Sequence, residues 1–276
     1  MRRGPDAGGL YELIATGDPL IWQLPVTEDV CAGAYEVEPF LYGGMALAAG
    51  IGVLERVTGR AVIRAQAQFA SAAALGERVD LVAEIPVTAD PVAQARVTGL
   101  VADREVFTIT GACGPLRGGS AMQWRRASTF PAPEACEQVT LWPRQNPQAR
   151  VRRNIEVRMR PGEYRRRLAE RHTSTSGRIR AWGRVTGAPL DAGVLALLAD
   201  FVPASVVLAT GRLGGGSSLD NTLRILQLVP TDWVRCEIHA DGLARGMGHG
   251  SIHLYARTGE LLAIGSQSFL QRYFDE

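Results

Sequence analysis

Three histidines are the first candidates for chemistry in this sequence. His249 and His253 are four residues apart in a segment typical of a strand, which places both on one face, and His239 lies in the preceding predicted strand. No carboxylate or thiolate at metal-ligand spacing accompanies them. Histidines of a core or an interface explain the pattern, so we expect no metal and no cofactor.

Cysteines and glycines offer no further cofactor site. The four cysteines, Cys31, Cys113, Cys136 and Cys236, lie far apart without a CxxC pair, so neither zinc nor a disulfide framework is indicated. Reduced thiols of a cytoplasmic protein are expected. The glycine run at 214–216 lacks the lysine of a phosphate-binding loop and precedes a predicted strand.

Bulk composition limits the classes of partner. With 276 residues, 46% of them hydrophobic, the chain can bury a large core, and its formal net charge of +2 gives no reason to expect nucleic acid. Asp18 and Pro19 interrupt the start before any apolar run of signal-peptide length. The apolar stretch from Val194 to Leu208 is broken by Asp200 and Pro203, so we expect no membrane span.

Any functional side chains must be positioned by two halves that share one plan. From Gly43 a run that is apolar almost all round predicts a buried helix, and Gly59 is a suitable stop. Strands are predicted near Val62 to Phe69, Arg78 to Val87, Val92 to Ala102 and Val106 to Cys113. One buried helix therefore precedes an antiparallel meander.

The second half repeats this order. Strands near Ile155 to Arg160 and Arg178 to Thr186 precede a helix from about Leu190 to Phe201, which Pro203 is expected to end. Four further strands are predicted near Ser218 to Leu228, Val234 to Ala240, Gly248 to Tyr255 and Leu261 to Tyr273. We predict an N-terminal half at 1–127, a proline-rich linker at 128–149 and a C-terminal half at 150–276. Their sheets are expected to join, giving an α+β fold.

Short motifs in order along the chain resemble the acyl-CoA thioesterase II family. They are Phe40-Leu-Tyr-Gly-Gly-Met in the first half, and Ser218-Leu-Asp-Asn, Pro230-Thr-Asp-Trp and Ala263-Ile-Gly-Ser-Gln-Ser in the second. The resemblance spans roughly Pro39 to Arg272. It implies a double hotdog, with two buried helices wrapped by one continuous antiparallel sheet. It also implies hydrolysis of acyl-CoA to free acid and coenzyme A, a role in lipid metabolism.

The resemblance also implies the site residues. In the family an Asp after the second helix, a Thr or Ser on the next strand and a Gln on the last strand hold a water, and Asp220 and Gln267 match two of these positions. A carboxylate can take a proton from that water while the amide orients it. By internal alignment Asp220 faces Arg64 or Ala65 of the first half and Gln267 faces Ala112, so both candidate catalytic residues belong to the second half only.

The third family position departs from the pattern, because counting from Trp233 places Asp241 where a hydroxyl is expected. Two carboxylates near one water would repel and raise the pKa of at least one. Asp241 can instead point to solvent in a turn before Gly242.

Gly43, Gly44 and Met45 open the first helix, where free N–H groups can polarise a thioester carbonyl. Tight packing explains the glycines equally well.

Several alternatives remain open from the sequence. Eleven arginines between Arg150 and Arg180 can contact coenzyme A phosphates or form a solvated helix face. A noncatalytic acyl-CoA-binding or partner-docking protein has the same fold. A hydratase or dehydratase would pair an Asp with a following His, which Asp220-Asn221-Thr222 lacks. We also expect a homo-oligomer, since hotdog sheets commonly extend across subunits.

Overall fold

The structure is a computed structural model that describes residues 9, 11–35, 37–88, 90–115, 121–141, 146–170 and 173–274. The start of the chain at 1–8 and 10, and Pro143 of the predicted linker, lie outside these residues.

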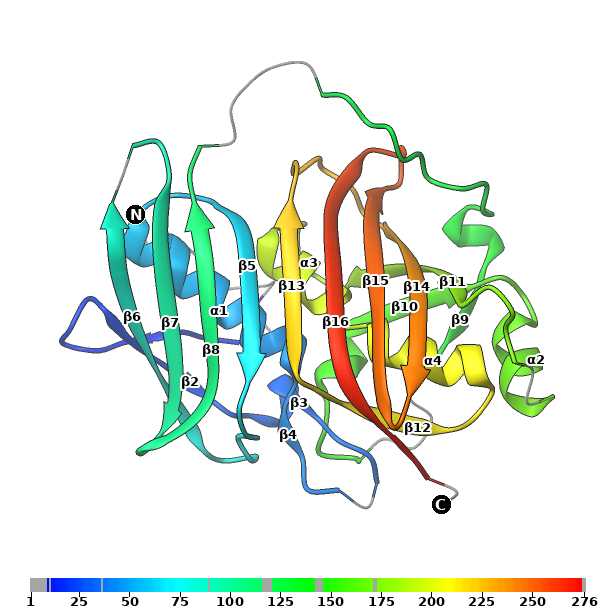
Figure 1. Cartoon of the computed structure of the whole chain (residues 1–276), viewed down its shortest axis with the longest axis horizontal. Helices are drawn as coiled ribbons and strands as arrows, with labels where there is room; N and C mark the ends of the chain where they lie inside the picture. The colour runs from blue at the N-terminus through cyan, green and yellow to red at the C-terminus, as the bar shows by residue number, and fades with distance from the viewer. Residues whose placement is uncertain are drawn as a thin grey trace.

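One antiparallel sheet of 14 strands forms the main layer (Figure 1). From one edge, the first half contributes β1 (Ile14–Ala15), β2 (Ile21–Pro25), β6 (Arg78–Thr88), β7 (Ala93–Val101), β8 (Arg104–Cys113) and β5 (Val62–Phe69). The second half continues with β13 (Asp220–Ile225), β16 (Leu261–Tyr273), β15 (Met247–Ala256), β14 (Val234–Ala244), β11 (Arg178–Val185), β10 (Ile155–Met159) and β9 (Glu137–Val139). β12 (Gly214–Ser218) pairs with the far end of β16.

The two halves join where β5 pairs with β13, with Ala67 opposite Asn221 and Ala65 opposite Leu223. The predicted continuous sheet is therefore confirmed, and with it the α+β class. Part of the segment predicted as a linker forms β9 and pairs with β10, so it extends the sheet. A separate pair, β3 (Cys31–Ala32) and β4 (Phe40–Leu41), lies before the first helix.

Helix α1 (Gly43–Thr58) begins and ends as predicted. Its residues from Gly44 to Leu54 are all buried, as an apolar surface on every side requires. Gly59 follows with φ 64°, and its N–H donates to the carbonyl of Glu55. Glycine adopts this left-handed conformation without steric penalty, so it ends the helix cleanly.

The second long helix is broken in two, contrary to the prediction that Pro203 ends it. Helix α3 (Ala192–Ala199) stops at Asp200, and α4 (Val202–Thr210) starts two residues later with Pro203 in its first turn. Proline is tolerated there because the first-turn N–H groups have no helical partner. Together Ala192–Thr210 are long and apolar enough to cross a membrane, but 89% of that window is buried inside the fold.

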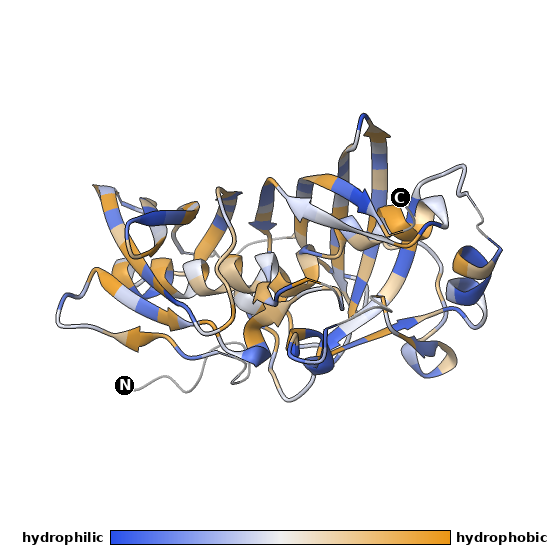
Figure 2. Cartoon of the chain, turned by 90° about the horizontal axis from the view of Figure 1, so that it is seen from below, coloured by the Kyte–Doolittle hydropathy of each residue, from blue (hydrophilic) through white to orange (hydrophobic). Residues whose placement is uncertain are grey.

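The helices lie against one face of the sheet, here called the inner face (Figure 2). On β16, Gly265, Gln267 and Phe269 are buried while Ser266, Ser268 and Leu270 between them are not. This alternation assigns the first set to the inner face and the second to the outer face. A short helix, α2 (Glu163–Ala169), packs beside α4 at the far end of the second half.

Candidate active site

A carboxylate lies in the break between α3 and α4. Asp200 is only 6% exposed and sits among the fully buried Ala199, Phe201 and Val202. The helix cannot run unbroken through this point, because Pro203 lacks the N–H that would bond to the carbonyl of Ala199. The break turns the Asp200 side chain toward α1 and the inner face of β16, as its hydrogen bonds show.

Both oxygens of this carboxylate accept strong hydrogen bonds. Gln267 donates from Nε2 to Asp200 Oδ1 at 2.5 Å, and the backbone N–H of Gly44 donates to Oδ2 at 2.7 Å. Gln267 Nε2 also donates to Ser218 Oγ at 2.7 Å. Elements from both halves therefore converge here: the start of α1, the break after α3, the end of β12 and the inner face of β16.

Ser218 reaches the inner face because of its register. It pairs with the buried Phe269, whereas Thr222 pairs with Ser266. A constant register from Ser218 would pair Thr222 with Gly265, so one residue is inserted between the two pairs. This irregularity puts Ser218 and Asn221 on the inner face and Asp220 on the outer face.

The electrostatics suit a base that works near neutral pH. Burial raises the pKa of Asp200 to about 6, although hydrogen bonds from Gln267 and Gly44, the charge of Arg152 and the Tyr42 hydroxyl each lower it. Burial likewise lowers the pKa of Arg152 to about 10, while Tyr42 and Asp200 raise it. A carboxylate balanced in this way can exchange a proton with bound water.

Two buried amides leave polar atoms without partners. Asn221 is 0% exposed, and neither its Nδ2 nor its Oδ1 has a hydrogen-bond partner within the described part of the chain. The same is true of Gln267 Oε1. The registers of β13 and β16 place Asn221 across from Gln267 on the inner face. Since an unpaired buried polar group costs about 1–3 kcal/mol, these atoms are expected to bind water or substrate.

Comparison with known proteins identifies the family. Residues 133–270 match the acyl-CoA thioesterase C-terminal domain. A solved structure from Novosphingobium aromaticivorans, provisionally named a thioesterase, is 36% identical, with a TM-score of 0.84 over 94% of this chain and 97% of that one. The chain belongs to the acyl-CoA thioesterase II family.

More distant relatives share the fold. A provisionally named thioesterase II from Thermobifida fusca is 15% identical with a TM-score of 0.82, over 94% of this chain and 96% of that one. An acyl-CoA thioesterase II from Mycobacterium marinum is 17% identical with a TM-score of 0.72, over 95% and 96%. No functionally curated protein matches the chain.

Within this thioesterase fold, Asp220 does not meet Gln267. Asp220 pairs across the seam with the exposed Gln68, and its Oδ1 accepts the backbone N–H of Ser268 at 2.6 Å. Its side chain therefore lies on the outer face, while the Gln267 amide lies on the inner face. The expectation that the Asp220 carboxylate and the Gln267 amide share one pocket is wrong, because the irregularity after Ser218 reverses the alternation.

Asp241 also lies away from Gln267. It is 42% exposed at an irregularity within β14, where its Oδ1 contacts His239 Nδ1 at 2.7 Å and its Oδ2 is 3.9 Å from His249 Nε2. The strand continues to Ala244, so Gly242 does not form a turn. The hydroxyl that lies next to the Gln267 amide is that of Ser218. Among the described residues, no group of histidines, cysteines and carboxylates is arranged to hold a metal.

The glycines at the start of α1 serve the site differently from the expectation. The N–H of Gly44 is bonded to Asp200, so it holds the carboxylate and is not free for a carbonyl oxygen. A Cβ at position 44 would lie 2.9 Å from Asp200 Cβ, so only glycine allows this approach. A Cβ added at Gly43 would lie 3.0 Å from Asp200 Oδ2, and Met45 is fully buried in the core.

Sequence reasoning missed Asp200, Ser218 and Asn221 as site residues. Asp200 was visible as the one charged residue between Val194 and Leu208. Burying a carboxylate costs folding free energy, so a carboxylate within a segment that is otherwise apolar enough to be buried is a candidate functional residue. This was the available signal.

Proposed function

We propose that this chain hydrolyses an acyl thioester of coenzyme A to a free acid and coenzyme A. The observation that supports the proposal is the buried Asp200 carboxylate, held by Gln267 and Gly44 beside amide atoms that have no partner. Family membership supports the reaction class. A carboxylate that can accept a proton, next to an amide that can orient water, suits hydrolysis.

The first step is attack by water. A water beside Asp200 donates one hydrogen to the carboxylate and the other to Gln267 Oε1, which directs an oxygen lone pair toward the thioester carbon. Asp200 accepts the proton as the carbon–oxygen bond forms. Because the Gln267 amide cannot take that proton, it orients the water without competing for it.

The second step is collapse of the tetrahedral intermediate. Its negative oxygen needs a hydrogen-bond donor, and we assign Asn221 Nδ2, which is buried and unpartnered on the same face. The carbon–sulfur bond then breaks, and the proton held by Asp200 passes to the departing thiolate. The Ser218 hydroxyl, which accepts from Gln267, can donate its own hydrogen toward water or sulfur.

The competing functions make different predictions for one assay. Free thiol release is measured over short, long, branched and aromatic acyl-CoAs. We expect turnover of at least one class, with loss in the variant Gln267→Ala. Saturable binding without thiol release from any member would contradict hydrolysis and favour a binding protein. Consumption of an enoyl or hydroxyacyl thioester without thiol release would favour a hydratase.

A further inference from the structure

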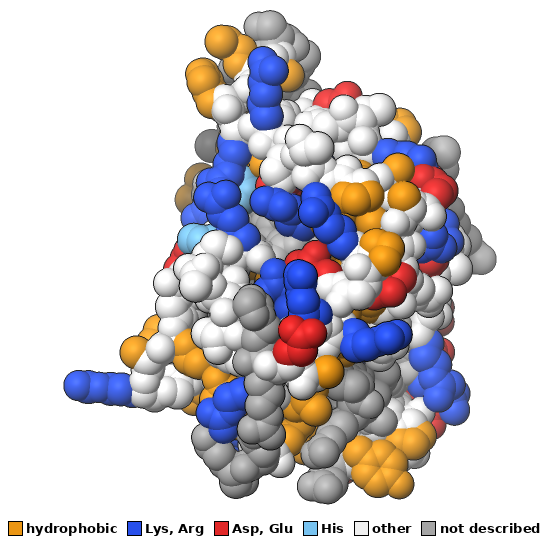
Figure 3. Space-filling view, turned by 90° about the vertical axis from the view of Figure 1, so that its right-hand side faces the viewer, with side chains coloured by type: hydrophobic (Ala, Val, Ile, Leu, Met, Phe, Trp, Pro, Cys, Tyr) orange, Lys and Arg blue, Asp and Glu red, His pale blue; other side chains and the backbone are white. Residues whose placement is uncertain are grey.

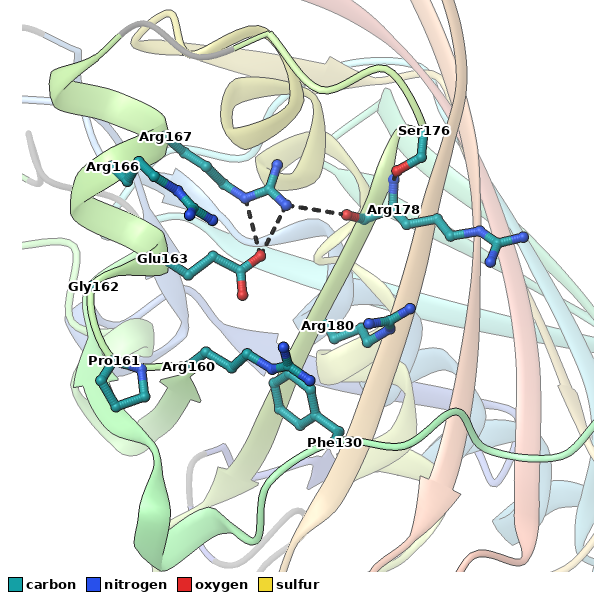
Figure 4. A pocket seen from close by; sticks show the side chains of 10 residues that line it. All are labelled: Phe130, Arg160, Pro161, Gly162, Glu163, Arg166, Arg167, Ser176, Arg178 and Arg180. Carbon is teal, nitrogen blue, oxygen red and sulfur yellow. Dashed lines mark hydrogen bonds and ion pairs between the residues drawn. The ribbon is translucent and has the colours of Figure 1, made fainter.

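A second feature of the molecule, separate from the Asp200 site, is a pocket of about 670 Å³ with five arginines in its lining. Arg166 and Arg167 come from α2, Arg178 and Arg180 from β11, and Arg160 follows β10 above the ring of Phe130 (Figure 4). Arginine side chains gather on the end of the molecule that carries α2 (Figure 3).

The end of β10 creates this pocket. β10 pairs with β11 only between Trp182 and Val185, and the chain then leaves the sheet toward α2. Residues 178–181 of β11 therefore have no β10 partner on that edge. The pocket lies at this edge, between α2, which packs against α4, and the exposed side chains of β11.

The charges in the pocket are only partly balanced. Glu163, the carboxylate of the lining, binds Arg167 at 2.8 Å, and the Arg160 guanidinium lies 5.5 Å from the centre of the Phe130 ring. Arg166, Arg178 and Arg180 form no ion pair with any described carboxylate. Several uncompensated guanidinium groups around one hollow repel each other, and a multivalent anion removes that repulsion.

We propose that this arginine pocket binds the phosphate groups at the nucleotide end of coenzyme A. The pocket volume is in the range of small-molecule sites, and guanidinium groups match phosphate oxygens through paired hydrogen bonds. Two guanidinium groups already lie over the Phe130 ring, those of Arg160 and Arg235, so the proposed recognition uses the phosphates and not stacking of the base. This inference rests on the proposed function for the identity of the carrier.

The distance to the Asp200 site suits the carrier. Arg178 pairs with His239, the next residue Ala240 pairs with Gly250, and Gly250 pairs with Gln267. Three strand spacings of about 4.8 Å, about 14 Å in all, separate Arg178 from Gln267 along the sheet. Arg178 lies on the outer face and Gln267 on the inner face, so the arm must pass the free edge of β11. A pantetheine arm is about as long as a four- to five-residue extended peptide and therefore covers roughly the same distance.

Direct binding tests the pocket without requiring catalysis. The probe is 3′-phosphoadenosine 5′-phosphate, titrated by calorimetry into the wild type, the double variant Arg178→Ala/Arg180→Ala and the variant Arg166→Ala. Arg96→Ala is the matched control, because Arg96 pairs with Glu84 on the exposed surface of the first half. We expect Kd to rise at least 10-fold in the double variant, less in Arg166→Ala, and not in the control.

No binding by the wild type at millimolar probe, or equal binding by all folded variants, would overturn the proposal. Arg166→Ala keeps the test valid if the double variant does not fold.

Kinetics then link the pocket to the reaction. For an acyl-CoA, the double variant should raise KM about 10-fold with kcat unchanged. For the matching acyl-pantetheine, which lacks the phosphates, KM should not change. An equal rise with both substrates would overturn the assignment. Arginine dependence seen only with an acyl carrier protein, without probe binding, would assign the pocket to an acidic protein surface instead. If no thioester is hydrolysed, the proposed function fails while the calorimetry still decides the pocket.

Discussion

The two halves of the sheet share one plan but differ in the polarity of their inner faces. In the first half, α1 runs unbroken for 16 residues against Ala65, Ala67 and Ile109. In the second half, the helix breaks at Asp200, and the inner face carries the fully buried Asn221 and Gln267. The inner face of the first half is therefore apolar here, while that of the second half carries buried polar groups.

The buried polar groups of the second half are the ones to which the proposed chemistry is assigned. Buried carboxylates and unpartnered amides destabilise a fold unless their surroundings hold them. The first half is still needed, because Gly44 at the start of α1 donates to the Asp200 carboxylate. We infer one site per chain, built mainly by the second half and completed by the first.

A large effect is expected at Gln267, on the polar inner face of the second half. Replacing it by methionine, which has a similar shape, removes the donor to Asp200 and the acceptor for water. We expect kcat to fall about 1,000-fold, within the range for acid–base machinery. Gln68→Met, on the exposed outer face, is the control and should leave kcat within about twofold in a thiol-release assay. Comparable losses in both variants would contradict the inner-face assignment.

A smaller effect is expected at Asn221, where activity and stability should move separately. Asn221→Val removes the proposed donor to the carbonyl oxygen, and we expect kcat to fall about 100-fold. The same change removes an unpaired buried amide, so the free energy of unfolding should stay equal or rise by about 1 kcal/mol. Thiol release and urea denaturation measure the two quantities. A large loss of stability would show that the amide has a structural partner.

The contribution of the first half is tested at Gly44. An added Cβ would lie 2.9 Å from Asp200 Cβ and from Tyr42 Cε1, and 3.1 Å from the carbonyl oxygen of Ala196. Gly44→Ala should therefore destabilise the fold by about 1–3 kcal/mol and lower kcat about 10-fold by displacing the carboxylate. Gly242→Ala is the control, because nothing lies within 4 Å of its added Cβ. Equal thermal unfolding of both variants would contradict the close approach.

The pH dependence should reflect the raised pKa of Asp200. The base must be ionised, so kcat/KM should fall about 10-fold per pH unit below pH 6 and level off above it. Stability changes in the opposite direction. Because folding raises the pKa of Asp200 from 3.8 to about 6, its contribution to stability is largest below pH 4 and is lost as the pH rises through 6. A flat rate profile between pH 5 and 7 would contradict Asp200 as the base.

Much of the fold could be predicted because its signals are local. The bounds of β5 and β16 coincide with the predicted segments, since alternating apolar residues define strands, and Gly43 and Gly59 bound α1 as expected. The N-terminal strand β2 and the glycine-rich β12 were missed, because Trp22 and Gln23 break the alternation and glycines disfavour strands.

The site could be predicted only in part. The sequence places Gln267 correctly on the last strand. Nothing in the sequence around Asp220 indicates that one residue is inserted after Ser218, which turns the Asp220 side chain to the outer face. The sequence predicts one helix that ends before Pro203, whereas the chain forms two helices with Asp200 in the break between them. Register and helix breaks depend on tertiary packing and were not readable from composition or periodicity.

The most direct test compares two carboxylates that differ by 20 positions in the chain and lie on opposite faces of the sheet. Thiol release from an acyl-CoA is measured for Asp200→Asn and Asp220→Asn, with circular dichroism to confirm folding. We predict that Asp200→Asn lowers kcat about 1,000-fold or more, and that Asp220→Asn stays within about threefold of the wild type. Loss of activity in Asp220→Asn with near-normal turnover in Asp200→Asn would contradict the assignment of the base.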